Sequence, residues 1–129
     1  MILLDTHTLV WLELEPNRLS AAATSAIRQA RREDGVAVAA ITLWELALLL
    51  SRGRVKAQGT LEVSVRMFVE HAGVQIKPLT PQIAAASQEF PKNFSLADRL
   101  IAATARAEGI PLVTRDERIR KSTLLRTIW

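Results

Sequence analysis

Short runs of consecutive apolar residues alternate along this chain with longer segments in which apolar residues recur every three or four positions. Residues 2–4 and 36–40 form continuous apolar runs, the pattern of strands that are buried on both faces of a sheet. Further strands are expected at residues 74–77, 110–113 and 127–129. Since strands that alternate with helices form βαβ units, the pattern predicts a mostly parallel sheet.

The segments between these strands have helical periodicity and favourable helix ends. Helices are expected at residues 8–14, 20–32, 42–52, 61–71, 95–108 and 116–121, with another that begins at residue 81. Ser20 and Ser95 are favourable N-cap residues, and Gly73 and Gly109 are favourable helix stops. No repeat, linker or low-complexity segment interrupts the pattern. We therefore expect residues 1–129 to form a single α/β domain with three layers in the order α/β/α.

Composition limits the classes of protein to which this sequence can belong. Of its 129 residues, 49% are hydrophobic and 23% are charged, the balance of an ordinary globular domain. The absence of cysteine excludes disulfides and thiolate zinc sites. No apolar run approaches the roughly 18–20 residues that span a bilayer, and the apolar start of the chain meets Asp5 instead of following a basic region. We expect a soluble, cytoplasmic protein.

The formal charge of +4 permits a polyanionic partner such as RNA without establishing one. Basic residues crowd the last part of the chain, namely Arg115, Arg118, Arg120, Lys121 and Arg126. A solvated helix face explains such a cluster equally well, so charge alone assigns no function.

Four acidic residues follow the predicted strands at one edge of the sheet. Asp5 comes directly after the first strand, and Asp116 follows the fourth. Glu45 and Asp98 lie in the first turns of two predicted helices. Ligands of open parallel sheets bind beyond the carboxyl ends of the strands. The four residues are therefore candidates for a single site.

Three of these acids also have a simpler explanation when each is taken alone. Thr42 and Glu45 have the spacing of a capping box, in which the glutamate bonds the start of the helix. Ser95 and Asp98 have the same spacing, and Asp116 could begin a turn. The positions of these residues do not by themselves decide between a cap and a site.

Taken together, the four carboxylates point to a metal site. Two carboxylates about 4 Å apart repel each other by roughly 4 kcal/mol at an effective dielectric constant near 20, so an ionised cluster requires a cation. Asp5, at the end of a buried strand, needs a partner in any case. Oxygen ligands favour Mg²⁺ or Mn²⁺, which can activate water for displacement at phosphorus. Thr6 and Thr114 flank two of the acids and could orient a ligand or cap helices.

Four blocks of sequence are spread over essentially the whole chain. They are ILLDTH at residues 2–7, AITLWE at 40–45, DRLIAATA at 98–105 and LVTRDERI at 112–119. In order and spacing they resemble the PIN-domain family and, within it, the toxin ribonucleases of the VapC type; the last two blocks are the most specific. Ser95 departs from the pattern, because many relatives have an aspartate there. The departure leaves the four acids intact and an auxiliary acidic role at this position open.

The resemblance implies the PIN fold, dependence on Mg²⁺ or Mn²⁺, and endonucleolytic cleavage of RNA, with structured RNA such as tRNA or rRNA as the expected substrate. It also implies a homodimer and a cognate antitoxin that blocks the site. The acids that bind metal in the family correspond to Asp5, Glu45, Asp98 and Asp116. The first three would hold the essential metal, and Asp116 would complete the centre or hold a second metal. Arg99 and Arg115, the arginines nearest to these acids in sequence, are expected to steer the phosphate backbone.

The predicted helix at residues 42–52 is apolar almost all round, so it is either fully buried or shared between the core and a partner. Trp44 and Leu48 lie on one face of it, and Met67 and Phe68 on the next helix could extend that surface. Together with Trp11, these residues are the expected antitoxin surface, since toxins of this type bind the antitoxin in such a groove.

Other functions stay open at this point. A PIN nuclease of RNA maturation or decay would act without an antitoxin, and a short neighbouring gene for a DNA-binding partner would distinguish the toxin from it. A non-catalytic, receiver-like metal-binding module is disfavoured because Asp5 has no acidic neighbour and no lysine directly follows the fourth strand. A phosphatase of the haloacid dehalogenase type would need a second aspartate at residue 7, where this chain has His7.

Overall fold

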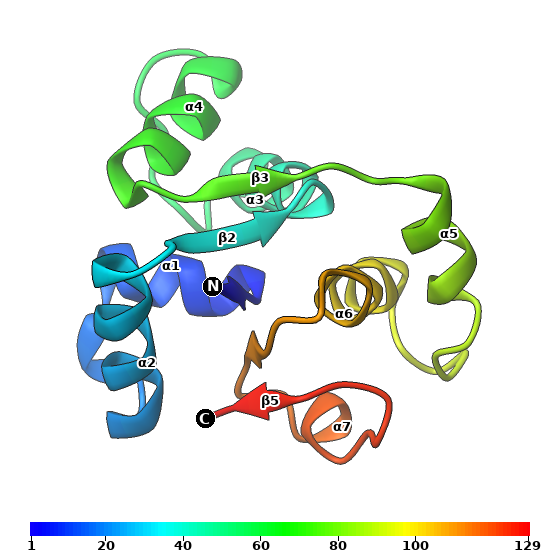
Figure 1. Ribbon diagram of the computed structural model, residues 1–129. Coiled ribbons are helices and arrows are strands. Elements are labelled where there is room, and N and C mark those ends of the chain that lie inside the picture. The colour runs from blue at the N-terminus through cyan, green and yellow to red at the C-terminus, as the bar shows by residue number, and fades with distance from the viewer.

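The computed structural model describes residues 1–129 and contains a five-stranded sheet in the order β3-β2-β1-β4-β5. All four pairs of neighbouring strands are parallel (Figure 1). The strands are β1 (Ile2–Leu4), β2 (Val36–Ala39), β3 (Gln75–Lys77), β4 (Leu112–Val113) and β5 (Thr127–Ile128). The predicted parallel sheet is confirmed. Strand β4 is shorter than expected, because the N–H of Ile110 bonds Ala105 to end a helix and Pro111 has no N–H to donate.

Seven α-helices and one 3-10 turn, η1 (Pro16–Arg18), connect the strands. The helices are α1 (Thr6–Leu14), α2 (Ala21–Arg32), α3 (Ile41–Ser51), α4 (Leu61–Ala72), α5 (Pro81–Ser87), α6 (Leu96–Glu108) and α7 (Glu117–Arg120). Helix α1 begins at Thr6 and not at residue 8 as predicted. The reason is that the Asp5 carboxylate accepts the N–H of Thr6 and so caps the helix directly at the end of β1.

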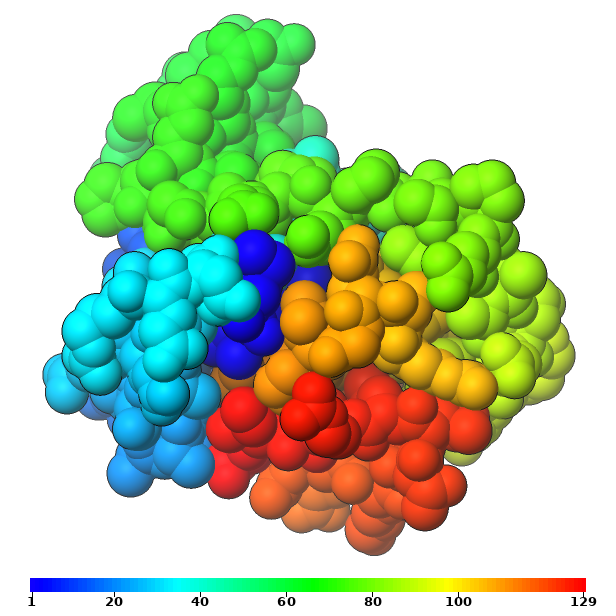
Figure 2. Space-filling model, in the orientation of Figure 1, coloured from blue at the N-terminus to red at the C-terminus, as the bar shows by residue number.

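Each face of the sheet packs on its own set of helices. Leu3 belongs to one core, with residues of α5, α6 and α7, whereas Ile2 and Leu4 belong to the other, with residues of α1, α2, α3 and α4. All three side chains are buried, as the continuous apolar run predicts. The helices therefore enclose the sheet from both sides (Figure 1), and α2 lies beside the C-terminal strand in the space-filling view (Figure 2). The predicted three-layer α/β/α architecture is confirmed.

Two of the predicted helix caps have different outcomes. Ser95 caps α6, where its hydroxyl accepts the N–H of Asp98 at 3.1 Å. The capping box at Thr42 and Glu45 is wrong, because α3 begins at Ile41 and has no side-chain cap. Thr42 instead lies inside the first turn with its side chain buried, so Glu45 is left for contacts outside its own helix.

The strand order reverses at β1, which lies between β2 and β4. The chain first builds β2 and β3 on one side of β1, and then crosses to build β4 and β5 on the other. Ligands of such sheets bind outside the carboxyl ends of the strands at the point of reversal. Asp5 directly follows β1 at this point. Elsewhere in the fold, none of the helices has the length and apolar character required to cross a membrane.

Candidate active site

The four acids singled out in the sequence line one cavity of about 410 Å³ at the carboxyl edge of the sheet. The lining residues are Asp5, His7, Trp11, Glu45, Ser95, Asp98, Asp116 and Arg118. Trp11 is the one hydrophobic side chain among them. Convergence of the acids, which in the sequence was inferred only from strand ends, is thus a feature of the structure.

Asp5 is the most deeply buried of the four acids, with 8% of the residue exposed. Its N–H bonds the carbonyl oxygen of Val113 at 3.1 Å, which ties the end of β1 to the end of β4. One carboxylate oxygen accepts the N–H of Thr6 at 2.8 Å, and the other accepts the hydroxyl of Thr114 at 2.7 Å. The orientation of the Asp5 carboxylate is therefore fixed by the backbone N–H of Thr6 and the uncharged side chain of Thr114.

Glu45 reaches the cavity from α3 and is held by threonine hydroxyls. The Thr6 hydroxyl donates to Glu45 Oε1 at 2.6 Å and lies 2.9 Å from the Thr42 hydroxyl. Because a hydroxyl has a single proton to donate, Thr42 must be the donor to Thr6 in this arrangement. Both threonines are buried. This short chain of hydrogen bonds fixes Glu45 relative to Asp5, since Thr6 contacts both acids.

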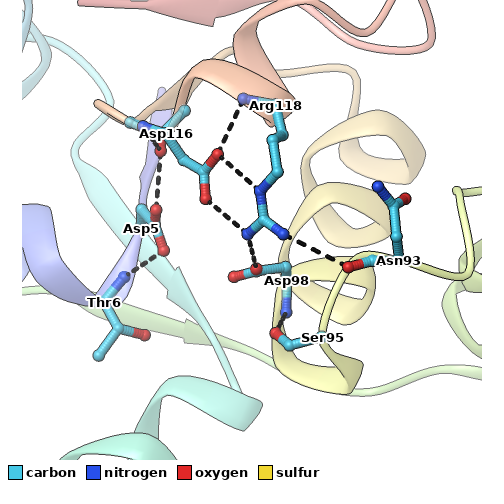
Figure 3. A network of polar contacts seen from close by, with 8 residues as sticks. Asp5, Thr6, Asn93, Ser95, Asp98, Asp116 and Arg118 are labelled. Atoms are coloured by element: carbon cyan, nitrogen blue, oxygen red, sulfur yellow. Dashed lines mark hydrogen bonds and ion pairs between the residues drawn. The ribbon is translucent and has the colours of Figure 1, made fainter.

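Asp98 and Asp116 are joined by the guanidinium of Arg118 (Figure 3). One terminal nitrogen of Arg118 lies 3.3 Å from Asp98 Oδ2 and 3.1 Å from Asp116 Oδ2, and the other donates to the carbonyl oxygen of Asn93 at 3.3 Å. The Arg118 guanidinium also lies 5.8 Å from the ring centre of Phe94. In addition, Asp116 caps α7 by accepting the N–H of Arg118 at 2.9 Å.

Arg118 is the cavity residue whose role the sequence did not reveal. In the sequence it is one of several basic residues near the C-terminus. Its place two residues after Asp116, on the first turn of a helix that Asp116 caps, was the available signal. The two oxygens of Asp116 receive both the backbone and the side chain of Arg118, a local arrangement that sequence spacing alone does not specify.

The electrostatic state of the acids differs across the cavity. Burial raises the pKa of Asp5, and the negative charge of Asp98 adds to this effect against the opposing hydrogen bonds of Thr114 and Thr6. The pKa of Glu45 is raised by burial, and further by the charges of Asp5 and Asp98. Burial also acts to raise the pKa of Asp116, but the hydrogen bonds and charge of Arg118 outweigh it and hold that pKa below its usual range.

The donor set fits a hard divalent cation. It consists of carboxylate oxygens, the ligands that Mg²⁺ and Mn²⁺ prefer, and burial raises the pKa values of Asp5 and Glu45 on one side of the cavity. No three acidic or histidine side chains are arranged as a preformed metal cage. The cation that Asp98 and Asp116 contact in this structure is the guanidinium of Arg118.

The flanking residues predicted for the site fall in different places. Thr6 and Thr114 each bond an acid, as described above. Ser95 lines the cavity and caps α6. Arg115 is exposed, with its guanidinium 5.8 Å from the ring centre of Trp11. Arg99 is half-buried and is not among the lining residues; its Nε is buried without a hydrogen-bond partner.

The residues predicted for a partner surface do not form one groove. Trp44 is 55% exposed and lines an apolar groove of about 560 Å³ between α3 and α4, so α3 is not fully buried. Met67 and Phe68 line a separate cavity next to α1, and Leu48 is half-buried on α3. Trp11 does not line this groove, and its ring lines the acidic cavity instead.

Comparison with known proteins places this fold and cavity in a family. The family model described as the PIN domain matches residues 2–123. The chain belongs to the PIN-domain family. A curated relative, ribonuclease VapC22 of Mycobacterium tuberculosis, is 40% identical over 132 residues, which cover 99% of this chain and 98% of the relative. The resemblance inferred from the four sequence blocks is therefore confirmed.

Solved structures agree with this fold. VapBC2 from Rickettsia felis, bound to a DNA fragment from its promoter, has a TM-score of 0.74 at 19% identity, covering 98% of this PIN-domain chain and 97% of the other. DNA-bound VapBC from Salmonella typhimurium has a TM-score of 0.67 at 18% identity, with coverages of 98% and 97%. At this level of identity the likeness supports the fold of the chain.

Proposed function

We propose that this protein is the toxin of a type II toxin–antitoxin pair and a metal-dependent endoribonuclease, with residues 1–129 as its single nuclease domain in the cytoplasm. The observation that supports this most directly is the convergence of Asp5, Glu45, Asp98 and Asp116 in one cavity of a PIN-domain chain. The relative named as a ribonuclease matches along its whole length, which supports RNA as the substrate. Structured RNA such as tRNA or rRNA is the substrate class we favour.

Asp5, Glu45 and Asp98 would hold Mg²⁺ or Mn²⁺, and Asp116 would complete the centre. When bound, such a cation supplies a Lewis acid for hydrolysis of a phosphodiester. The protein's own contribution is orientation. Thr114 and the N–H of Thr6 fix the two oxygens of Asp5 before any ligand arrives, so no reorganisation of this carboxylate is needed.

Arg118 would have two partners in turn. In the free protein it offsets one of the two negative charges of Asp98 and Asp116. Its side chain is about half exposed, so it is able to turn toward a phosphate once a divalent cation takes over the carboxylates. Guanidinium groups suit phosphate oxygens because they donate two parallel hydrogen bonds.

The exposed apolar groove between α3 and α4 favours a toxin with an antitoxin over a nuclease that acts alone. Its lining includes Leu43, Trp44, Ala47, Leu61, Val65 and Val69, with Glu62, Arg66 and Glu70 beside them. An apolar groove with charged margins fits the apolar face of an amphipathic helix. We assign this groove to the cognate antitoxin. An antitoxin bound in this groove would join the toxin homodimer in a larger toxin–antitoxin assembly.

A second apolar surface fits the homodimer. Leu79 is 55% exposed and lines a hollow of about 210 Å³ with Ile41 and Leu100, close to the acidic edge of the sheet. Trp44 belongs to both this hollow and the antitoxin groove. In a dimer formed through this surface, the antitoxin groove would lie next to the dimer interface, with Trp44 at the boundary between them.

Cleavage of purified tRNA and rRNA tests the proposal. We expect Mg²⁺- or Mn²⁺-dependent cuts that stop in excess chelator and in Asp98→Ala, while circular dichroism shows a folded variant. Replacement of Glu89, a surface acid paired with Arg106, by alanine is the matched control and should cleave normally. Full activity in chelator, or in folded Asp98→Ala, would overturn the metal-dependent mechanism.

A further inference from the structure

Trp11 stands out because aromatic and basic groups from several segments gather around it at the margin of the acidic cavity. The guanidinium of Arg18, in η1, lies 4.5 Å from its ring centre, and that of Arg115 lies at 5.8 Å. The ring of Trp129 is 5.9 Å away and that of His7 is 6.2 Å away. Trp129 packs against the core that contains Leu4, but neither hydrophobic core includes Trp11, so packing of the sheet does not explain the position of Trp11.

The cluster continues away from the acids into a basic hollow. Trp129 contacts Trp11 and also lines a neighbouring cavity of about 500 Å³. The other residues of that cavity are Glu117, Arg120, Lys121 and Thr127. The two tryptophans thus connect the acidic cavity with a hollow whose charge is mainly positive. We call the six residues Trp11, Trp129, Arg18, Arg115, Arg120 and Lys121 the aromatic–basic strip.

This arrangement has the chemistry that single-stranded nucleic acid requires. Phosphates are repelled by a cavity with four acids and attracted by the arginines beside it. Unpaired bases stack on aromatic rings and on guanidinium planes, whereas bases inside a helix offer no free face. A strip that alternates rings with basic groups therefore favours an unpaired strand over a duplex.

We propose that the aromatic–basic strip binds the single-stranded RNA that flanks the scissile phosphate, with one unpaired base stacked at Trp11. This inference rests on the proposed ribonuclease function and adds to it the surface of this chain that holds the substrate beside the cut. Trp11 is in this view a substrate-binding residue and not a member of the antitoxin surface.

Binding of an unstructured RNA of about 12 nucleotides, measured by fluorescence anisotropy in the Asp5→Asn background to prevent cleavage, tests the proposal. Trp11→Leu should weaken binding about tenfold, and Trp11→Phe should retain most of the affinity, since base–aromatic stacking requires only a flat ring. An RNA of equal length without bases keeps every phosphate. It should bind Trp11→Leu and the Trp11 protein with similar affinity.

The chain offers a matched control. Arg18 pairs with Glu15 and is 47% exposed, and Arg106 pairs with Glu89 and is 36% exposed. Arg18→Ala should weaken binding several-fold, and Arg106→Ala should not.

Fluorescence gives a second measurement that a purely structural role of Trp11 would not affect. In a Trp44→Phe, Trp129→Phe protein, Trp11 is the only tryptophan, and RNA should quench its emission while the baseless strand should not. Equal affinity of Trp11→Leu and the parent for RNA, or quenching by the baseless strand, would overturn the proposal. Absence of RNA cleavage by the natural chain would instead contradict the ribonuclease function, so the two failures are distinguishable.

Discussion

The two halves of the acidic cavity hold their carboxylates by different means. Asp5 and Glu45 are fixed by threonine hydroxyls and a backbone N–H, and their pKa values are raised because of burial. Asp98 and Asp116 share the guanidinium of Arg118. On that side the pKa of Asp116 is lowered despite partial burial.

The difference separates orientation from neutralisation. A hydroxyl orients a carboxylate but leaves its negative charge in place, so the Asp5 half still attracts a cation. A guanidinium does both, so on the side of Asp98 and Asp116 one of the two negative charges is already offset before a metal arrives. We infer that a divalent cation is held first by the threonine-supported half. Four experiments, given from the largest expected effect to the smallest, test this distinction.

The largest effect is expected at Asp5. Asp5→Asn keeps the size of the side chain but removes a charged oxygen ligand, so RNA cleavage should fall by more than the roughly 10–100-fold typical of losing an outer-shell partner. Asp116→Asn should reduce cleavage less. Both rates are measured with Mg²⁺ at saturating concentration, with thermal unfolding to verify the fold. A larger loss in Asp116→Asn than in Asp5→Asn would reverse the proposed roles of the two halves.

Thr114→Val removes the hydroxyl that orients Asp5 while it preserves side-chain shape. The fully buried Thr114 donates to Asp5 at 2.7 Å and accepts the N–H of Asp116 at 3.1 Å, so each of these groups would lose a partner at a cost of about 1–3 kcal/mol of stability. Mn²⁺ affinity, measured by calorimetry, should fall about tenfold. Thr104→Val is the control, because Thr104 is also buried but bonds the carbonyl oxygen of Leu100 in α6. Equal Mn²⁺ affinities in the two variants would show that orientation of Asp5 is unimportant.

The same distinction explains what the sequence could predict. Asp5 follows a continuous apolar run, and such a run predicts a buried parallel strand whose end lies at the ligand edge. The sheet, the layers and the convergence of the acids follow from that reasoning. The Thr42–Glu45 capping box was wrong because the buried hydroxyl of Thr6, from another helix, provides Glu45 with a tertiary partner. Local spacing contains no information about such a contact.

Arg118 and Trp11 are surface examples of contacts that the sequence could not predict. A basic cluster near the C-terminus is visible in the sequence, but which arginine meets two carboxylates depends on the direction in which α7 leaves β4. As a large apolar residue, Trp11 is equally suited to a core or to a partner surface. Only the packing of η1 and the C-terminal strand beside α1 brings Arg18 and Trp129 to its ring.

A smaller effect is expected at Arg118, where a substitution should strengthen Mn²⁺ binding instead of weakening it. Because its guanidinium competes with metal for Asp98 and Asp116, Arg118→Gln should tighten Mn²⁺ binding by up to about fivefold, the range of one exposed ion pair. The metal-free variant should also unfold at a lower temperature, since two carboxylates lose their cation. Arg120→Gln, at an exposed position on the same helix, is the control. Weaker Mn²⁺ binding in Arg118→Gln than in Arg120→Gln would contradict competition.

The smallest effect concerns the pH dependence of stability without metal. Glu45 has a raised pKa in the folded protein, so above its ordinary value of 4.5 the folded state binds more protons than the unfolded state. Stability must then decrease as pH rises from 4.5 through the raised pKa. The lowered pKa of Asp116 has the opposite consequence: its contribution is present above the ordinary value of 3.8 and is lost as pH falls through the lowered pKa.

Urea unfolding in chelator, over the range from pH 3 to pH 7 in which these groups titrate, distinguishes the two signs. Glu45→Gln should gain stability relative to the parent as pH rises, because the variant has no carboxylate to ionise in a buried place beside Asp5. Asp116→Asn should lose stability relative to the parent over the lower part of the range as pH rises, since the parent then gains its ion pair with Arg118. Glu33→Gln, an exposed position, provides the baseline. Parallel curves for Glu45→Gln and Asp116→Asn would mean that both halves of the cavity hold charge in the same way, and that the threonine-supported half has no special demand for a cation.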